Sequence, residues 1–177
     1  ARRKVVAFTS PYYRYEQQLA VRIADAGKYA TLSDLRGRPV ATLKGAQSND
    51  ELLEAGWTPE LLIQRDNSQQ PYDDLISKRA DAVLQEDIIT RYYTLKDSRI
   101  HVVARTFSPN VYGAAFRLED GALRARVDEE LAHMKADGTL GAIYEEWGLW
   151  TPSQTTIGVA KGSAAPRIAA PVRWLDS

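Results

Sequence analysis

The chain has 177 residues, of which 44% are hydrophobic and 26% charged, and its 23 Lys and Arg residues are balanced by 23 Asp and Glu residues. The hydrophobic fraction is too high for a disordered protein, and a formal charge of zero argues against a nucleic-acid-binding protein that neutralises phosphates. No apolar run approaches the roughly 20 residues that a membrane-spanning helix needs. The length suits one domain or two small lobes.

Short apolar runs that end in turn-forming residues predict strands, and they alternate with segments whose residues favour helices. In the first half of the chain, strands are expected at residues 5–8, 17–23, 39–43 and 61–63. A helical turn is expected at 33–37 and a helix at 71–79, where Pro71 suits the first turn. Another helix should run to about Ala55, with Ser48 or Asn49 as its N-terminal cap.

The second half continues this alternation, with strands expected at 81–84, 100–103 and 111–116 and helices at 88–95 and 121–135. In the helix at 121–135, apolar residues recur at spacings of 4, 4 and 3, namely Leu123, Val127, Leu131 and Met134. A shorter helix should follow, with an apolar stripe at Leu140, Ile143, Tyr144 and Trp147. From Thr151 the composition changes, and residues 160–172 are typical of a linker or tail.

Alternating strands and helices predict an α/β fold with a largely parallel sheet, in which ligands bind beyond the carboxyl ends of the strands. Two of these ends carry polar groups. Backbone N–H groups in the turn 43–48 would attract an anion, and Glu86 and Asp87, which follow the strand 81–84, would attract a cation. An anion site beside a cation site suits a zwitterion such as an amino acid. Alternatively, Glu86 and Asp87 only cap the next helix.

The sequence offers few groups for catalysis or metal binding. It has no cysteine and two histidines, His101 and His133, neither of which has a partner at metal-ligand spacing. The glycine-rich and nucleophile motifs of phosphate-binding and hydrolytic sites are absent. We therefore expect no catalytic residue, no metal and no cofactor.

Several segments resemble one known family in their order and spacing. Arg2 precedes Phe8 by six residues, and Ser10-Pro11-Tyr12 follows. The other matching segments are Leu35-Arg36-Gly37, Leu43-Lys44-Gly45, Arg79-Ala80-Asp81-Ala82-Val83, Tyr112-Gly113-Ala114-Ala115, Met134-Lys135-Ala136-Asp137-Gly138-Thr139-Leu140 and Ile143-Tyr144-Glu145-Glu146-Trp147-Gly148. From Ala1 to about Trp150 the chain resembles the type II periplasmic solute-binding proteins of ABC importers, in the polar-amino-acid branch called solute-binding family 3.

This resemblance implies a two-lobed, periplasmic-binding-protein-like type II α/β fold, with mixed and mostly parallel sheets, that clamps one amino acid. By position, Arg2 matches the arginine that grips the ligand carboxylate in a bidentate pair. Gln47 stands where many members have a hydroxyl residue that supports this carboxylate, and Glu86 stands where an Asp usually accepts the ligand ammonium. The expected ligand-binding residues are Arg2, Leu43, Gly45, Gln47, Glu86 and Asp87.

Placed on the family pattern, the chain divides into the end of lobe 1 with the first hinge strand (1–24), lobe 2 (25–106), the second hinge strand (107–118), lobe 1 helices (119–150) and a tail or linker (151–177). Lobe 2 would then be complete and lobe 1 partial, because no lobe 1 strands precede Arg2 and the chain starts without Met. We therefore expect an N-terminally incomplete piece of a longer binding protein, with the apolar stripe of its helix at 121–135 exposed. A second copy could instead cover this stripe, as a homodimer or an exchanged dimer.

The resemblance implies a periplasmic or cell-surface receptor that passes an amino acid to the membrane permease of an ABC importer, without enzymatic activity and without nucleic acid as a partner. Two alternatives stay open. One is the same fold as the ligand-binding sensor domain of a signalling receptor. The other, with weaker support, is a dehydratase-like enzyme on this scaffold that uses Glu86 or Asp87 as a general acid or base.

Overall fold

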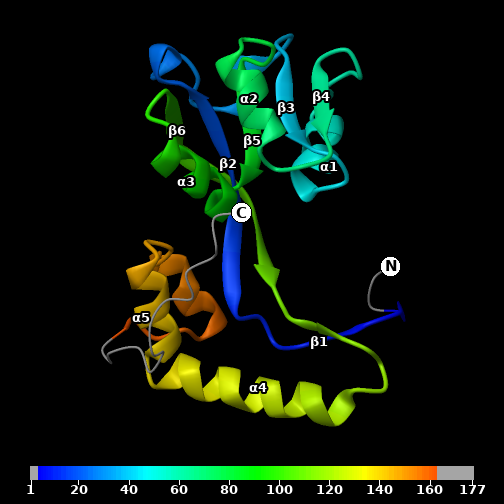
Figure 1. Cartoon of the computed structure of the whole chain (residues 1–177), viewed down its shortest axis with the longest axis vertical. Helices are drawn as coiled ribbons and strands as arrows, with labels where there is room; N and C mark the ends of the chain where they lie inside the picture. The colour runs from blue at the N-terminus through cyan, green and yellow to red at the C-terminus, as the bar shows by residue number, and fades with distance from the viewer. Residues whose placement is uncertain (1–3, 163–177) are drawn as a thin grey trace, which may run out of the picture. The chain divides into compact units, whose positions relative to one another are not determined.

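The computed structural model describes residues 4–162 (Figure 1). The chain forms two compact units: unit 1 contains the residues up to Arg14 and from Val111 onward, and unit 2 contains residues 15–110. The chain passes from one unit to the other within two strands, β2 (Tyr13–Arg22) and β6 (Ile100–Tyr112). Strands and helices alternate along the chain, so the expected α/β class is confirmed.

Unit 2 is built on a five-stranded sheet with the strand order β4-β3-β5-β2-β6. β3 (Val40–Leu43) pairs in parallel with β4 (Leu62–Arg65) and with β5 (Ala82–Glu86), whereas β2 and β5 are antiparallel. The sheet is therefore mixed. Because β2 runs against β5, the N-terminal half of β2 lies at the same edge of the sheet as the carboxyl ends of β3 and β5.

Helices cover both faces of this sheet. They are α1 (Gln47–Glu54), α2 (Gln70–Ile76) and α3 (Asp87–Lys96), with short 3-10 helices η2 (Ile23–Asp25) and η3 (Leu32–Leu35). Side chains alternate along β2, so Leu19 and Val21 enter one apolar core and Ala20 enters the other. α1 adds Leu52 to the core of Leu19, and α2 adds Leu75 to the core of Ala20. The two faces of the sheet therefore carry separate cores.

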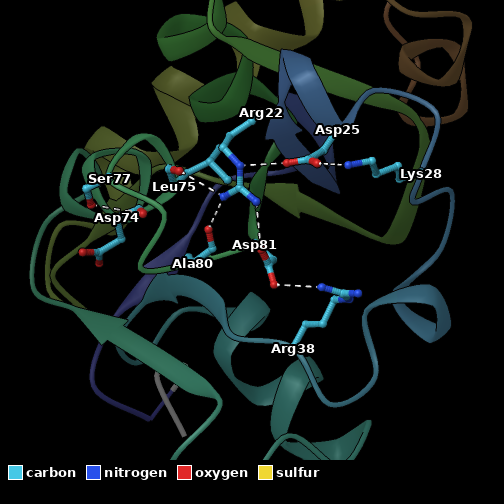
Figure 2. A network of polar contacts seen from close by, with 9 residues as sticks. All are labelled: Arg22, Asp25, Lys28, Arg38, Asp74, Leu75, Ser77, Ala80 and Asp81. Atoms are coloured by element: carbon cyan, nitrogen blue, oxygen red, sulfur yellow. Dashed lines mark hydrogen bonds and ion pairs between the residues drawn. The ribbon is translucent and has the colours of Figure 1, made fainter.

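A polar network joins the end of β2 to the start of β5, at the end of unit 2 remote from the carboxyl ends of β3 and β5. Figure 2 shows the Arg22 guanidinium among Asp25, Asp81 and two backbone carbonyl groups. Arg22 lies 2.7 Å from the Asp25 carboxylate and 2.8 Å from that of Asp81, and it donates to the carbonyl oxygens of Ala80 (2.6 Å) and Leu75 (3.2 Å). Asp81, which belongs to the sequence motif 79–83, thus stabilises the fold of unit 2 through its ion pair with Arg22.

Unit 1 contains a two-stranded antiparallel sheet and helices. Its elements are β1 (Ala7–Phe8), β7 (Ala115–Phe116), α4 (Gly121–Ala136), α5 (Thr139–Glu146) and the 3-10 helix η4 (Pro152–Ile157). The segment after β1 is held by both helices: the Ser10 N–H donates to Asp128 (2.6 Å) and the Tyr144 hydroxyl donates to the carbonyl oxygen of Tyr12. These contacts join residues more than a hundred positions apart.

Part of the stretch expected to be a tail or linker is ordered in unit 1. Gln154 in η4 is fully buried, and its side-chain amide bonds both the N–H and the carbonyl oxygen of Arg14, at 2.9 and 2.7 Å. Val159 is also buried. Residues from 163 onward lie outside the described part of the chain.

Several helix and strand boundaries differ from those predicted from the sequence. α1 begins at Gln47 with Ala46 as its N-cap residue, so the prediction that Ser48 or Asn49 caps this helix is wrong. The Ser48 hydroxyl instead bonds the Thr42 hydroxyl at 2.6 Å, which ties the start of α1 to β3. The strand expected at 111–116 is split between the end of β6 and β7. Within residues 4–162, no helix has the length and apolar character to cross a membrane.

The helix expected at 121–135 is present as α4, and its apolar stripe is poorly covered. No residue of α4 is buried. Leu123 is 57% exposed, and Val127, Leu131 and Met134 are half-buried. Of the four residues of the stripe that we expected to be exposed, Leu123 alone is exposed.

Candidate ligand-binding site

Most of the ligand-binding residues predicted from the sequence meet at one edge of unit 2. This is the edge where β3 ends at Leu43, β5 ends at Glu86 and β2 begins. Tyr15 and Gln17 lie in the N-terminal half of β2, and Gln17 is directly opposite Glu86 in the register of β2 and β5. The antiparallel pairing of β2 and β5 thus adds two side chains to an edge at which we expected only the turn 43–48 and the residues that follow the strand 81–84.

The turn between β3 and α1 depends on glycine. Gly45 has φ of 70°, in the left-handed region that favours glycine. The Ala46 N–H donates to the Leu43 carbonyl oxygen at 3.2 Å, which closes the turn, and α1 then starts at Gln47. The first N–H groups of an α-helix have no intrahelical partner and carry the positive end of its dipole. Leu43 and Gly45 therefore shape the turn that aims these N–H groups at the edge.

The Gln47 side chain sits at the centre of a local network. Its Oε1 accepts from the Tyr15 hydroxyl (3.1 Å) and from Asn110 Nδ2 (2.8 Å). Its Nε2 donates to Glu51 (2.9 Å) and to the carbonyl oxygen of Ser108 (3.4 Å). Burial raises the pKa of Glu51 above its usual range. Because both amide atoms of Gln47 are engaged, an anion here would meet the backbone N–H of Gln47 and not its side chain.

Glu86 and Asp87 differ in their roles although they are adjacent. Glu86 is the half-buried last residue of β5. Asp87 is the first residue of α3, and its Oδ1 accepts the N–H of Ile88 at 2.7 Å. Burial raises the pKa of Asp87 to about 6, and the charges of Glu16 and Glu86 add to this shift. Glu86, the last residue of β5, occupies the N-cap position of α3, and Asp87 supplies a side-chain contact to the first turn, so the capping interpretation applies to both residues.

Gln17 is the residue at this edge that the sequence reasoning missed. It is fully buried, and neither Nε2 nor Oε1 of its side chain has a hydrogen-bond partner. The inward-facing residues of β2 are Tyr13, Tyr15, Gln17, Leu19 and Val21. A glutamine in this otherwise aromatic and apolar series was the available signal.

Arg2 lies outside the described residues, so its predicted contact with a ligand carboxylate stays a prediction. Tyr15 and Asn110, which bond Gln47, were not predicted because they come from strands far from residues 43–48 in the sequence. In the described part of the chain, no group of three or more His, Cys, Asp or Glu residues could hold a metal ion.

Comparison with known proteins places the chain among solute-binding proteins. The model of the bacterial extracellular solute-binding proteins, family 3, matches residues 1–149. ABC transporter arginine-binding protein 1 of Escherichia coli (strain K12) is 28% identical over 152 residues, covering 82% of this chain and 60% of that protein. The glutamine-binding protein GlnH of Bacillus subtilis (strain 168) is 26% identical over 148 residues, covering 82% of this chain and 53% of that protein.

The fold agrees with this match. A crystal structure of a mutant of ArgBP from T. maritima superposes with a TM-score of 0.73 at 28% identity, covering 83% of this chain and 63% of that one. The chain thus has the α/β periplasmic-binding-protein fold. It spans between half and two thirds of the length of these relatives.

Proposed function

The chain belongs to family 3 of the bacterial extracellular solute-binding proteins, and from this we propose that it is the amino-acid-binding component of an ABC importer. Its role is then to bind and release one amino acid without chemical change. The membrane permease of the importer is its protein partner, and its location is periplasmic or at the cell surface. These assignments rest on the family and on relatives named for arginine and glutamine binding.

One structural observation carries the proposal: the N-terminus of α1 and the carboxylate of Glu86 lie at the same edge of unit 2. A free amino acid carries one carboxylate and one ammonium group. The backbone N–H groups at the start of α1 suit the carboxylate, and Glu86 suits the ammonium. Arg2 would add a bidentate pair to the carboxylate, as its position in the family pattern implies.

A thermal-shift screen of the full chain tests this function. Arginine, glutamine, histidine and cystine form the first set, since relatives are named for these ligands. A ligand at 100 times its Kd stabilises the folded state by about 2.7 kcal/mol. We expect at least one standard amino acid to raise the Tm by several degrees and to give a saturable heat in calorimetry.

Two variants make the screen specific. Arg2→Ala should weaken binding by tenfold or more, because the ligand carboxylate loses its charged partner. Arg91→Ala removes an exposed arginine of α3 and should leave the affinity unchanged. The proposed function is wrong for this chain if no amino acid raises the Tm or gives a heat of binding.

A further inference from the structure

The side-chain amide of Gln17 has no partner within the protein. Its relative exposure is 0%, and both of its polar atoms lack a hydrogen bond. The neighbouring polar side chains at this edge are satisfied: Tyr15 bonds Gln47, and Thr42 bonds Ser48 at 2.6 Å. In the described residues, Asn49 Oδ1 is the one other buried side-chain atom of this kind, and the Nδ2 of Asn49 donates to Asp50.

An unpaired buried amide destabilises the folded state, because it loses its hydrogen bonds to water and gains none in return. A leucine at this position would carry no such cost and would match Leu19 and Val21 along the strand. The cost is offset only if a molecule other than the protein bonds the amide. The position of Gln17 says which kind of molecule this is.

Gln17 and Glu86 face one another across β2 and β5, and their side chains project from the same face of the sheet. On the same face, the hydroxyl of Thr42 in β3 bonds the hydroxyl of Ser48 in the first turn of α1. The Glu86 carboxylate, which is proposed to bind the ligand ammonium, therefore has the neutral amide of Gln17 as its direct neighbour. The amide provides one acceptor and two N–H donors at that point.

We propose that Gln17 is a ligand-binding residue that bonds the bound amino acid beside Glu86. This inference rests on the proposed function and deepens it. Gln17 Oε1 accepts an N–H of the ligand, and Nε2 donates to a ligand oxygen. The ligand chemistry is therefore an N–H donor next to a carbonyl or carboxylate oxygen, which is found in the head group of every amino acid and in the side-chain carboxamide of glutamine and asparagine.

The test compares the binding of amino acids to the wild-type chain, Gln17→Leu and Gln17→Met by calorimetry. Both substitutions keep a side chain of similar volume and remove its hydrogen bonds, and the methionine variant covers the case in which leucine does not fold. Gln18→Leu is the matched control, because Gln18 is the next residue of β2 and projects from the opposite face.

We expect Gln17→Leu and Gln17→Met to weaken binding at least tenfold while Gln18→Leu changes it less than twofold. Without ligand, the Tm of the Gln17 variants should equal or exceed that of the wild type, since an unpaired amide has been removed. A loss for every amino acid assigns Gln17 to the head group, and a loss confined to glutamine and asparagine assigns it to a carboxamide side chain.

Two failures are distinguishable. If the wild type binds an amino acid and the Gln17 variants bind it within twofold, this inference is overturned and the proposed function stands. That result would mean that an ordered water satisfies the amide. If the wild type binds no amino acid, both the proposed function and this inference are overturned.

Discussion

At the scale of single residues, Asp87 is the group whose protonation the fold alters most clearly at the candidate site. Burial of its carboxyl is the main cause of a pKa of about 6, and the charges of Glu16 and Glu86 act in the same direction. The backbone N–H groups of Ile88 and Glu16 oppose the shift by bonding the carboxylate. An unfolded Asp has a pKa near 3.9.

This difference predicts a pH dependence of stability. Between about pH 4 and pH 6 the folded chain holds a proton on Asp87 that the unfolded chain has lost, so the free energy of unfolding falls as the pH rises through this window. Asp87→Asn keeps an oxygen for the Ile88 N–H and removes the charge. We expect the fall to disappear and the variant to be more stable at pH 7, by an amount on the order of 2 kcal/mol.

Urea unfolding at pH 4, 5, 6 and 7 measures this effect. Glu129→Gln removes an exposed carboxylate from α4 and serves as the control, with the wild-type slope expected. An unchanged slope in Asp87→Asn would show that Asp87 ionises in the folded chain as it does in the unfolded one.

Sequence reasoning found part of this site and missed the rest for a definite reason. Glu86 was found from the end of a strand, which is a local feature that a single sequence reveals, and Gln47 was found from the resemblance to the family. Gln17 and Tyr15 join them only because β2 runs antiparallel to β5, and nothing local to residues 13–22 states that pairing. Their contribution to the edge is a consequence of strand order.

At the scale of elements, the join between β2 and β5 depends on Arg22. Its side chain is 16% exposed and contacts the carboxylates of Asp25 and Asp81 together with two carbonyl oxygens (Figure 2). Removing one member of a buried charged network leaves the other members without compensation, which costs more than the network contributes when it is intact.

We therefore expect Arg22→Met to lower the free energy of unfolding by roughly 3 kcal/mol. Methionine keeps much of the aliphatic volume, so the loss reports the guanidinium contacts. Arg36→Met, at an exposed position in the same unit, should stay within about 0.5 kcal/mol of wild type. Urea unfolding at one pH compares the three proteins, and an equal stability of Arg22→Met and Arg36→Met would contradict a structural role for Arg22.

The elements themselves were largely predictable from the sequence, and their ends were not. The alternation of short apolar runs with helical segments predicted β3, β5 and α1 to α5, and in α4 the apolar residues recur at helical spacing although none of them is buried. The predicted start of α1 was wrong because the Ser48 hydroxyl, which is of a type that caps helices, bonds the Thr42 hydroxyl instead. A tertiary contact thus overrode a local preference.

At the scale of the whole molecule, α4 presents an apolar stripe flanked by exposed charges. Leu123 is 57% exposed, and on one side of the stripe Arg126 and Glu130 are exposed at i and i+4. The stripe is nearly symmetric about the middle of the helix. Two copies of α4 packed antiparallel would therefore bring Leu123 against Met134 and Arg126 of one copy against Glu130 of the other.

We expect the chain to self-associate through this face, as a dimer whose population rises with concentration. Leu123→Glu should shift it to monomer, because each interface would then bury two unpaired carboxylates. Arg126→Glu should weaken the dimer, and the double variant Arg126→Glu with Glu130→Arg should restore it, since the exchange recreates both pairs. Light scattering after size-exclusion chromatography at about 10 to 300 μM gives the molar mass in each case.

Leu95→Glu controls for the general effect of placing a charge at an exposed leucine, because Leu95 is 74% exposed on α3 in the other unit. This substitution should not change the molar mass. The restored double variant is the decisive measurement, since a general gain in solubility cannot produce it. A wild type that stays monomeric over the whole concentration range contradicts the dimer. A dimer that survives Leu123→Glu and both charge variants places the interface elsewhere on the chain.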